Sequence, residues 1–318
     1  MNSFNKHIAT YLMLTVSAIL FVGCKPYQQF DKHLSRIIYR NKIQEKYVVS
    51  KDKTIHYFTT AINPTNQTIV LLHGFRADAK LQWTKTAKIL SKKYNVIFID
   101  LAYHGKTKSS IIDYSFDNQA ALVKEVIDNE NITAKVNMLG NSYGAMVASF
   151  FAEKFPEQID KLLLNDALTC LFTTKIADSV ATHFKVNSLY NLLNPLNAGE
   201  LKKTFQIVFH KKIIVPNFIA QSIIKNYFSP KESNNLQLFN YIRENEKLLS
   251  RVPKLNPQKT FYIWGNHDPL IPKYTGKKHQ ILIGVANKNW YEIKRTAHVP
   301  NLERNRRFCK TVDRILKE

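Results

Sequence analysis

The sequence predicts an α/β fold in which helices cover both faces of a mostly parallel, doubly wound sheet. Short apolar runs alternate along the chain with segments whose apolar residues recur every three or four positions, as buried strands and amphipathic helices do. In addition, a serine flanked by glycines, within residues 140–144, stands between one such run and one such segment. Right-handed crossovers through the helices make the strands of such a sheet parallel.

The predicted elements follow one another in a regular order. A hairpin is expected first, around the turn at residues 51–53, because β-rich runs flank that turn on both sides. Continuous apolar runs then predict strands at 68–72, 95–100, 135–139, 162–166, 260–264 and 290–293. Helical periodicity predicts helices at 83–90, 116–127, 145–155 and 301–317. These elements predict a core made of residues 46–166 and 256–318.

Residues 167–255 interrupt the strand–helix alternation. The pattern in this span is mainly helical, with breaks at Pro195 and Pro216 and with apolar clusters near residues 205–209 and 213–215. The span is too long for an ordinary connecting loop. We therefore expect a helical lid inserted into the core.

The first residues differ from the rest of the chain. Lys6 and His7 precede an apolar, uncharged run over residues 8–23, and Cys24 follows this run. The run is short for a helix that spans a bilayer, which needs about 20 residues. A basic start, an apolar middle and a small residue before the cut are typical of a secretory signal.

Residues 20–24 resemble the lipobox of bacterial lipoproteins, with Phe21 at a position where leucine is usual. The resemblance implies a signal peptide over residues 1–23, lipid attachment at Cys24 and a lipid-anchored tether over residues 24–45, which leads into a short surface helix. It further implies an exported bacterial lipoprotein, anchored to a membrane and facing the periplasm or the cell exterior. A signal anchor or a cleaved soluble protein is the alternative.

Composition limits the classes of function. Hydrophobic residues make up 45% of the 318 residues, enough to bury a sizeable core. The net charge of +22 comes largely from lysines that are spread along the chain, without the basic block interleaved with aromatics that marks nucleic-acid binders. This diffuse charge fits attraction to anionic lipid or polysaccharide, and it fits equally a compositional habit with solvated lysines.

Two cysteines remain once Cys24 is assigned to the anchor. An exported location permits a disulfide between Cys170 and Cys309. Cys309, however, shares a helical face with Leu302 and Val312, which favours two separate buried thiols.

The chemistry is centred on the Gly-x-Ser-x-Gly sequence. Gly140 and Gly144 are expected where a strand and a helix nearly touch, so that a side chain at either position would collide. Ser142 then projects from the end of the strand, next to the positive end of the following helix. This context favours a nucleophile over a serine in an ordinary loop.

A serine hydroxyl needs a base within hydrogen-bond reach and a group that orients the base. Asp268 follows one predicted strand and His298 follows the last one, so both are expected at the edge of the sheet where Ser142 emerges. Asp166 also follows a strand and is the alternative acid.

The chain resembles the α/β-hydrolase superfamily from residue 50 to residue 316. Five pieces in the family's order carry the resemblance: His-Gly-Phe at 73–75, the loop 100–105, the elbow at 140–144, Gly-x-x-Asp at 265–268 and Ala-His at 297–298. The resemblance implies a catalytic triad of Ser142 as nucleophile, His298 as general base and acid, and Asp268 as the group that orients the imidazole. It also implies an oxyanion hole made by the backbone N–H groups of Phe75 and Tyr143.

Other candidate residues receive structural roles. His73 is expected to support the oxyanion turn, and His104 and His267 are expected to be loop histidines. The sequence shows no cluster with metal-ligand spacing and no phosphate-binding glycine loop, so neither a metal nor a cofactor is expected.

The resemblance and the apolar lid together favour a serine hydrolase that cleaves a carboxylic ester, a carboxylesterase or lipase-like enzyme. Its expected partners are a small acyl or ester substrate with an apolar part and a membrane surface reached through lipidated Cys24, with no nucleic acid. Carbon–carbon bond hydrolases, iminopeptidases, acyltransferases and haloperoxidases share the triad and stay open. A surface binding lipoprotein without turnover is the alternative from another class.

Overall fold

The computed structural model describes residues 25–318, except for the side chains of residues 231 and 232. The predicted signal peptide and the lipid attachment at Cys24 lie outside the described residues. Within residues 25–318, no helix is both long and apolar enough to cross a bilayer.

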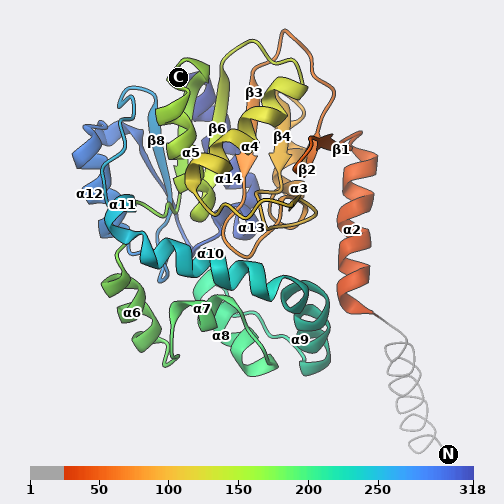
Figure 1. The fold of residues 1–318 in the computed structure, drawn as a ribbon, viewed down its shortest axis with the longest axis vertical. Coiled ribbons are helices and arrows are strands. Elements are labelled where there is room, and N and C mark those ends of the chain that lie inside the picture. The colour runs from red at the N-terminus through yellow and green to blue at the C-terminus, as the bar shows by residue number, and fades with distance from the viewer. Residues whose placement is uncertain (1–24) are drawn as a thin grey trace, which may run out of the picture.

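Within the described residues, the centre of the fold is one sheet of nine strands (Figure 1). The strand order is β1-β2-β4-β3-β6-β7-β8-β9, and the short β5 pairs with β2. From β4 to β9 all pairings are parallel, whereas β1 and β2 are antiparallel to their neighbours. The strands are β1 (Gln44–Val49), β2 (Lys53–Thr59), β3 (Thr68–Leu72), β4 (Asn95–Ile99), β5 (Lys108–Ser109), β6 (Val136–Asn141), β7 (Ile159–Asn165), β8 (Thr260–Gly265) and β9 (Trp290–Ile293). The predicted α/β fold, with a mostly parallel sheet and helices, is therefore confirmed.

Helices pack against both faces of this sheet, as its continuously apolar strands require. Helix α3 (Ala79–Leu90) and helix α14 (Asn305–Lys317) share one apolar core with the sheet. Helix α4 (Phe116–Asn129) and helix α5 (Tyr143–Lys154) belong to the core on the other face. The predicted last helix is divided into α13 (Pro300–Glu303) and α14, because Arg304 between them has a non-helical backbone.

The span predicted to be a lid is helical. It contains α6 (Thr174–His183), α7 (Leu189–Leu193), α8 (Ala198–Val208), α9 (Asn217–Ile223), a π-helical turn η2 (Ile224–Phe228), α10 (Glu232–Glu244) and α11 (Glu246–Leu249). In Figure 1 these elements form a layer below the sheet, which we call the cap. Cap residues and the end of β6 line common cavities, so the cap covers the edge of the sheet where Ser142 lies.

The segment predicted to be a tether with a short surface helix contains a helix of 15 residues, α2 (Pro26–Arg40). Leu34 and Ile38, one turn apart, bury its inner face. The helix lies beside α3 and α9, so residues 26–40 belong to the folded body (Figure 1). Elsewhere in the described chain, Cys170 and Cys309 are separate buried thiols.

Candidate active site

Ser142 occupies a strained turn between strand β6 and helix α5. Its backbone angles, φ of 52° and ψ of −116°, lie in a region that residues other than glycine rarely adopt. A Cβ added at Gly140 would lie 2.2 Å from the carbonyl oxygen of Gly144. A Cβ added at Gly144 would lie 2.5 Å from the carbonyl oxygen of Leu72. The two glycines are therefore required by the close approach of strand and helix, and this approach fixes the position of the serine.

Asp268 and His298 meet in the structure. His298 Nδ1 lies 2.8 Å from Asp268 Oδ2, and the carboxylate is fully buried. The other oxygen, Oδ1, accepts the backbone N–H groups of Leu270 at 2.8 Å and Ile271 at 3.2 Å. A carboxylate held in this way accepts the Nδ1 proton of the imidazole and leaves Nε2 as its basic nitrogen.

Ser142 and His298 line the same cavity, whose volume is about 510 Å³. Most of its wall is apolar and comes from the cap, from helix α2 and from the loop after β3. The structure thus brings Ser142, Asp268 and His298 together from distant parts of the sequence. The serine and the imidazole line the same cavity.

The two residues whose backbone N–H groups are expected to form an oxyanion hole line a cavity together with the serine. Helix α5 begins at Tyr143, so the N–H of Tyr143 belongs to the first turn, where a helix has no internal acceptor. Phe75 follows strand β3, and its ring packs edge-on against that of Tyr143, with 6.4 Å between the centroids. Ser142, Phe75 and Tyr143 also line a second, smaller cavity.

A buried amide network joins the loops of the site, and no sequence motif predicts it. Gln82 of helix α3 accepts the N–H of Gly74 at 2.8 Å and donates to Asn141, next to the serine. Asn141 in turn donates to the carbonyl oxygen of His298 at 3.3 Å. Because each amide has both a donor and an acceptor, the network fixes three segments relative to one another: the loop 73–75, which is the turn expected to form the oxyanion hole and is called the oxyanion turn, the elbow and the histidine loop.

These features agree with the comparison to known proteins. A family model described as the alpha/beta hydrolase fold matches residues 67–185, which include the oxyanion turn and the elbow. A solved structure of a membrane phospholipase A, described as a bacterial virulence factor, superimposes with a TM-score of 0.75 at 20% identity, and the match covers 100% of this chain and 98% of that one. The chain has the α/β-hydrolase fold.

Two curated proteins extend the comparison. An uncharacterized hydrolase, YugF of Bacillus subtilis, is 26% identical over 253 residues, which are 78% of this chain and 89% of the relative. The 2-hydroxy-6-oxononadienedioate/2-hydroxy-6-oxononatrienedioate hydrolase of Escherichia coli K12 is 25% identical over 260 residues, which are 77% and 85% of the two chains.

Asp166, the alternative acid, lies beside Asp268 in the α/β-hydrolase core. It is fully buried, its φ is 40°, and its Oδ1 accepts the N–H of Gly265 at 2.8 Å. Burial, and after it the neighbouring charge of Asp268, raise the pKa of Asp166 well above its usual range. Of the two carboxyl groups, Asp268 is the one that contacts the imidazole, while the raised pKa of Asp166 favours its protonated form.

Of the three other histidines considered in the sequence analysis, His73 and His104 are buried and His267 is exposed. His73 accepts the N–H of Leu101 on Nε2 at 3.0 Å, while its Nδ1 lies 2.8 Å from the carbonyl oxygen of Gly74. This is the arrangement of a neutral ring that supports the oxyanion turn. His104 is buried, and its Nδ1 lies 2.9 Å from the carbonyl oxygen of Ala102. His267, by contrast, is exposed.

Asp100 holds the loop that runs beneath the oxyanion turn. Its Oδ1 accepts the N–H of Ala79 at 2.8 Å, and its Oδ2 lies 2.6 Å from His56 Nδ1. Burial favours a higher pKa, but the hydrogen bond and the charge of His56 prevail, and the pKa of Asp100 falls to about 2. A Cβ added at Gly105 would lie 1.7 Å from Asp100 Oδ2, so glycine is required there.

Glu303 connects the histidine loop to the cap. Its Oε2 accepts the N–H of Ala297, next to the catalytic candidate His298, at 2.6 Å. Its Oε1 accepts the N–H groups of His210 at 2.9 Å and Lys211 at 3.2 Å. One side chain thus connects the cap to the loop that carries the imidazole, and no motif in the sequence indicates this role.

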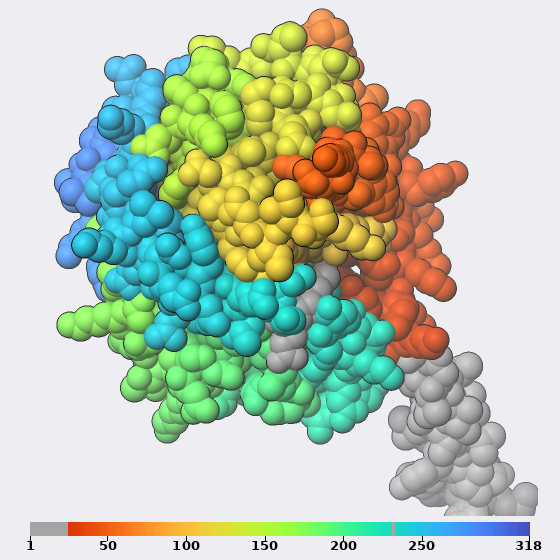
Figure 2. Space-filling view, in the orientation of Figure 1, coloured from red at the N-terminus to blue at the C-terminus, as the bar shows by residue number. Residues whose placement is uncertain are grey.

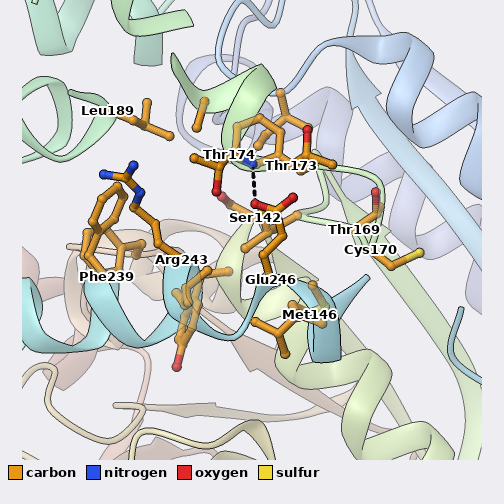
Figure 3. Close-up of a pocket in the computed structure, with 18 of the residues that line it drawn as sticks. Ser142, Met146, Thr169, Cys170, Thr173, Thr174, Leu189, Phe239, Arg243 and Glu246 are labelled. Atoms are coloured by element: carbon orange, nitrogen blue, oxygen red, sulfur yellow. Dashed lines mark hydrogen bonds between the residues drawn. The ribbon is translucent and has the colours of Figure 1, made fainter. Parts of the chain in front are cut away.

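The smaller cavity, of about 90 Å³, lies on the other side of the serine. Figure 3 shows Ser142 among apolar residues such as Met146 and a polar group made of Thr174 and Glu246. Glu246 accepts the N–H of Thr174 at 2.8 Å, and hydrogen bonding by Thr174 lowers the pKa of this carboxyl. In the described part of the chain, no group of His, Cys, Asp and Glu residues could hold a metal ion.

Proposed function

We propose that the protein is a serine hydrolase that cleaves carboxylic esters with an apolar acyl group. The observation that carries this proposal is the 2.8 Å contact between His298 and Asp268, together with a mainly apolar cavity of about 510 Å³ that both Ser142 and His298 line. Pockets of this size, apolar with a few polar groups, are typical of sites for small ligands.

In the proposed reaction, Ser142 Oγ attacks the ester carbonyl carbon while His298 Nε2 takes the hydroxyl proton. The N–H groups of Phe75 and Tyr143 stabilise the negative oxygen of the tetrahedral intermediate, each contributing about 3–4 kcal/mol. The intermediate collapses when the C–O bond breaks and His298 gives its proton to the leaving alcohol. Water then attacks the acyl-enzyme by the same route, with His298 as base, and releases the acid.

The apolar cavity supports an acyl chain as the main part of the substrate. The structural neighbour described as a membrane phospholipase A is consistent with this class, although its identity of 20% supports the fold alone. Hydrolysis of a carbon–carbon bond is the second candidate, because the Escherichia coli relative is named for a hydrolase of dienedioates and trienedioates. Such a dicarboxylate would need cationic partners, and Arg76, Lys85 and Arg243 line the two cavities.

A panel of p-nitrophenyl esters with acyl chains of increasing length, assayed beside a 2-hydroxy-6-oxo-dienoate, tests the proposal. We expect ester hydrolysis that rises with chain length, and labelling of the protein by a fluorophosphonate probe. A folded protein that resists the probe and turns over nothing would contradict the proposal and favour a binding lipoprotein. Turnover of the dienoate alone would favour carbon–carbon bond hydrolysis.

We also propose that the protein is held at a membrane by lipid on Cys24, as the lipobox-like residues 20–24 suggest. Lipid chains would keep the protein in the membrane fraction at high salt, because apolar anchoring is not screened by ions. We expect 1 M salt, at which the Debye length is about 3 Å, to release the Cys24→Ala variant from the membrane fraction. Retention of the variant in the membrane fraction would indicate an uncleaved signal anchor instead.

A further inference from the structure

The larger cavity joins the catalytic residues to the N-terminal helix. Its wall includes Ser142 and His298, and it also includes Tyr27, Phe30 and Leu34 of helix α2. The wall between them comes mainly from the cap, through Phe205, Val208, Ile219, Ile223, Tyr227 and Phe228. The first half of α2 is therefore part of the substrate space.

Contacts between α2 and the cap hold this wall together. The N–H of Tyr27 donates to Ser222 Oγ at 3.4 Å, and Gln28 Nε2 donates to Asn226 Oδ1 at 2.9 Å. The rings of Tyr27 and Tyr227 pack with 5.9 Å between their centroids. Figure 2 shows this boundary between α2 and the cap on the surface, where the red-orange helix meets the teal part of the cap.

The outer face of α2 is cationic. Lys32, Arg36 and Arg40 are exposed and follow one another at intervals of four residues, which places them on one side of the helix. The inner side carries the buried Leu34 and Ile38. Exposed cations on the helix that walls the cavity suit a surface of anionic lipids.

We propose that α2 forms the entrance wall of an acyl-chain site, and that the chain belongs to a lipid of an anionic bilayer and enters beside the first turns of α2. This inference rests on the proposed ester hydrolysis. The predicted lipid attachment at Cys24 lies two positions before Pro26, the first residue of the helix, and would keep this entrance close to the bilayer. Phe30 lines the cavity and has 40% of its surface exposed, so it faces both the cavity and the solvent.

The first experiment tests the wall. In the full-length protein, Phe30→Glu places a charge where the chain would enter, and Phe30→Trp narrows the same place with an apolar ring. Each buried methylene contributes about a four-fold gain in kcat/KM. We expect both variants to lower the ratio of kcat/KM for p-nitrophenyl dodecanoate over p-nitrophenyl butyrate at least ten-fold. Tyr39→Glu is the matched control, because Tyr39 lies on the same helix, is 84% exposed and does not line the cavity.

An unchanged ratio in both folded Phe30 variants would overturn the role of α2 as a wall. An equal loss in Tyr39→Glu would assign the effect to the helix as a whole and also overturn it. If the wild-type protein hydrolyses neither ester, the proposed function fails. If it hydrolyses both esters and the variants have no effect, the proposed function stands and only this inference fails.

The second experiment tests the source of the chain. Lys32→Glu/Arg36→Glu should lower hydrolysis of phosphatidylglycerol vesicles at least ten-fold and leave hydrolysis of monomeric dodecanoate ester within two-fold. Lys51→Glu/Lys135→Glu makes the same change of charge at two other exposed positions and should have little effect on either substrate. Equal losses in the two double variants, or none, would show that the chain does not come from a bilayer docked on α2.

Discussion

Ser142→Ala is expected to lower kcat for ester hydrolysis on the order of 10⁶-fold and to abolish labelling by a fluorophosphonate. Ser142 carries the only aliphatic hydroxyl of residues 140–144, and alanine leaves the imidazole with no nucleophile to deprotonate. The strained backbone of residue 142, with φ of 52°, also suits alanine no worse than serine, so the fold should persist. The measurements are the rate of p-nitrophenyl ester hydrolysis and the intensity of probe labelling.

Ser149→Ala is the matched control for this substitution. Ser149 lies on the same helix α5, is buried and donates to the carbonyl oxygen of Ala145 at 2.9 Å. Loss of this bond is expected to cost about 1 kcal/mol of stability and to leave kcat unchanged. Full probe labelling of Ser142→Ala would identify another nucleophile and remove the basis of the proposed mechanism.

The sheet could be predicted from the sequence because its strands are apolar on both faces. The predicted strands at 68–72 and 290–293 have the observed bounds, and the others differ by a few residues at their ends. The elbow could be recognised for a related reason, since Gly140 and Gly144 meet neighbouring backbone and leave no room for a side chain. Local patterns of this kind are visible in one sequence.

Elements with weak local patterns could not be predicted. Strand β5 has only two residues, and helix α12 (Lys273–Ile283) contains Gly276, whose missing side chain makes room for the ring of Trp264. Helix α2 was expected to be mainly a tether because most of its residues are polar, yet Leu34 and Ile38 suffice to bury one face. In each case the stabilising contact comes from a distant part of the chain.

The residues that hold the loops of the candidate site in place could not be predicted from the sequence for the same reason. Gln82, Asn141 and Glu303 act through hydrogen bonds to backbone groups of other loops. Such bonds need a residue with the right atoms at the right place, and no fixed spacing in the sequence reveals it. Motifs could indicate the reacting groups but not the residues that hold them.

Asp268→Asn is expected to lower kcat by about four orders of magnitude while leaving the fold intact. An asparagine at this position would still occupy the space and could still accept the N–H groups of Leu270 and Ile271, which now lie 2.8 and 3.2 Å from Oδ1. Its NH₂ group would then donate to His298 Nδ1 and favour the imidazole tautomer that is protonated on Nε2. This tautomer cannot take the proton of Ser142. Steady-state kinetics and a thermal melt of the same preparation measure both effects.

Asp166→Asn is the matched control, because Asp166 is the neighbouring buried carboxyl. We expect its kcat to stay within a few-fold of wild type. Because the pKa of Asp166 is raised in the folded state, folding favours the protonated form. The stabilisation of the fold by protonated Asp166 is fully present below the pKa of the unfolded state, about 3.9. It is lost as the pH rises through the raised pKa of the folded state. Asparagine does not titrate, so the variant should match wild type near pH 4 and melt at a higher temperature at pH 8.

The two substitutions together decide which carboxyl orients the imidazole. If Asp166→Asn is the variant that loses four orders of magnitude in kcat, the acid lies after β7, and the contact between His298 and Asp268 is not the catalytic one. If both variants lose activity to the same extent, the two carboxyl groups act as a pair that shares a proton, as closely spaced buried acids do. Only a large loss in Asp268→Asn with a small one in Asp166→Asn supports a triad in which Asp268, and not Asp166, orients the imidazole.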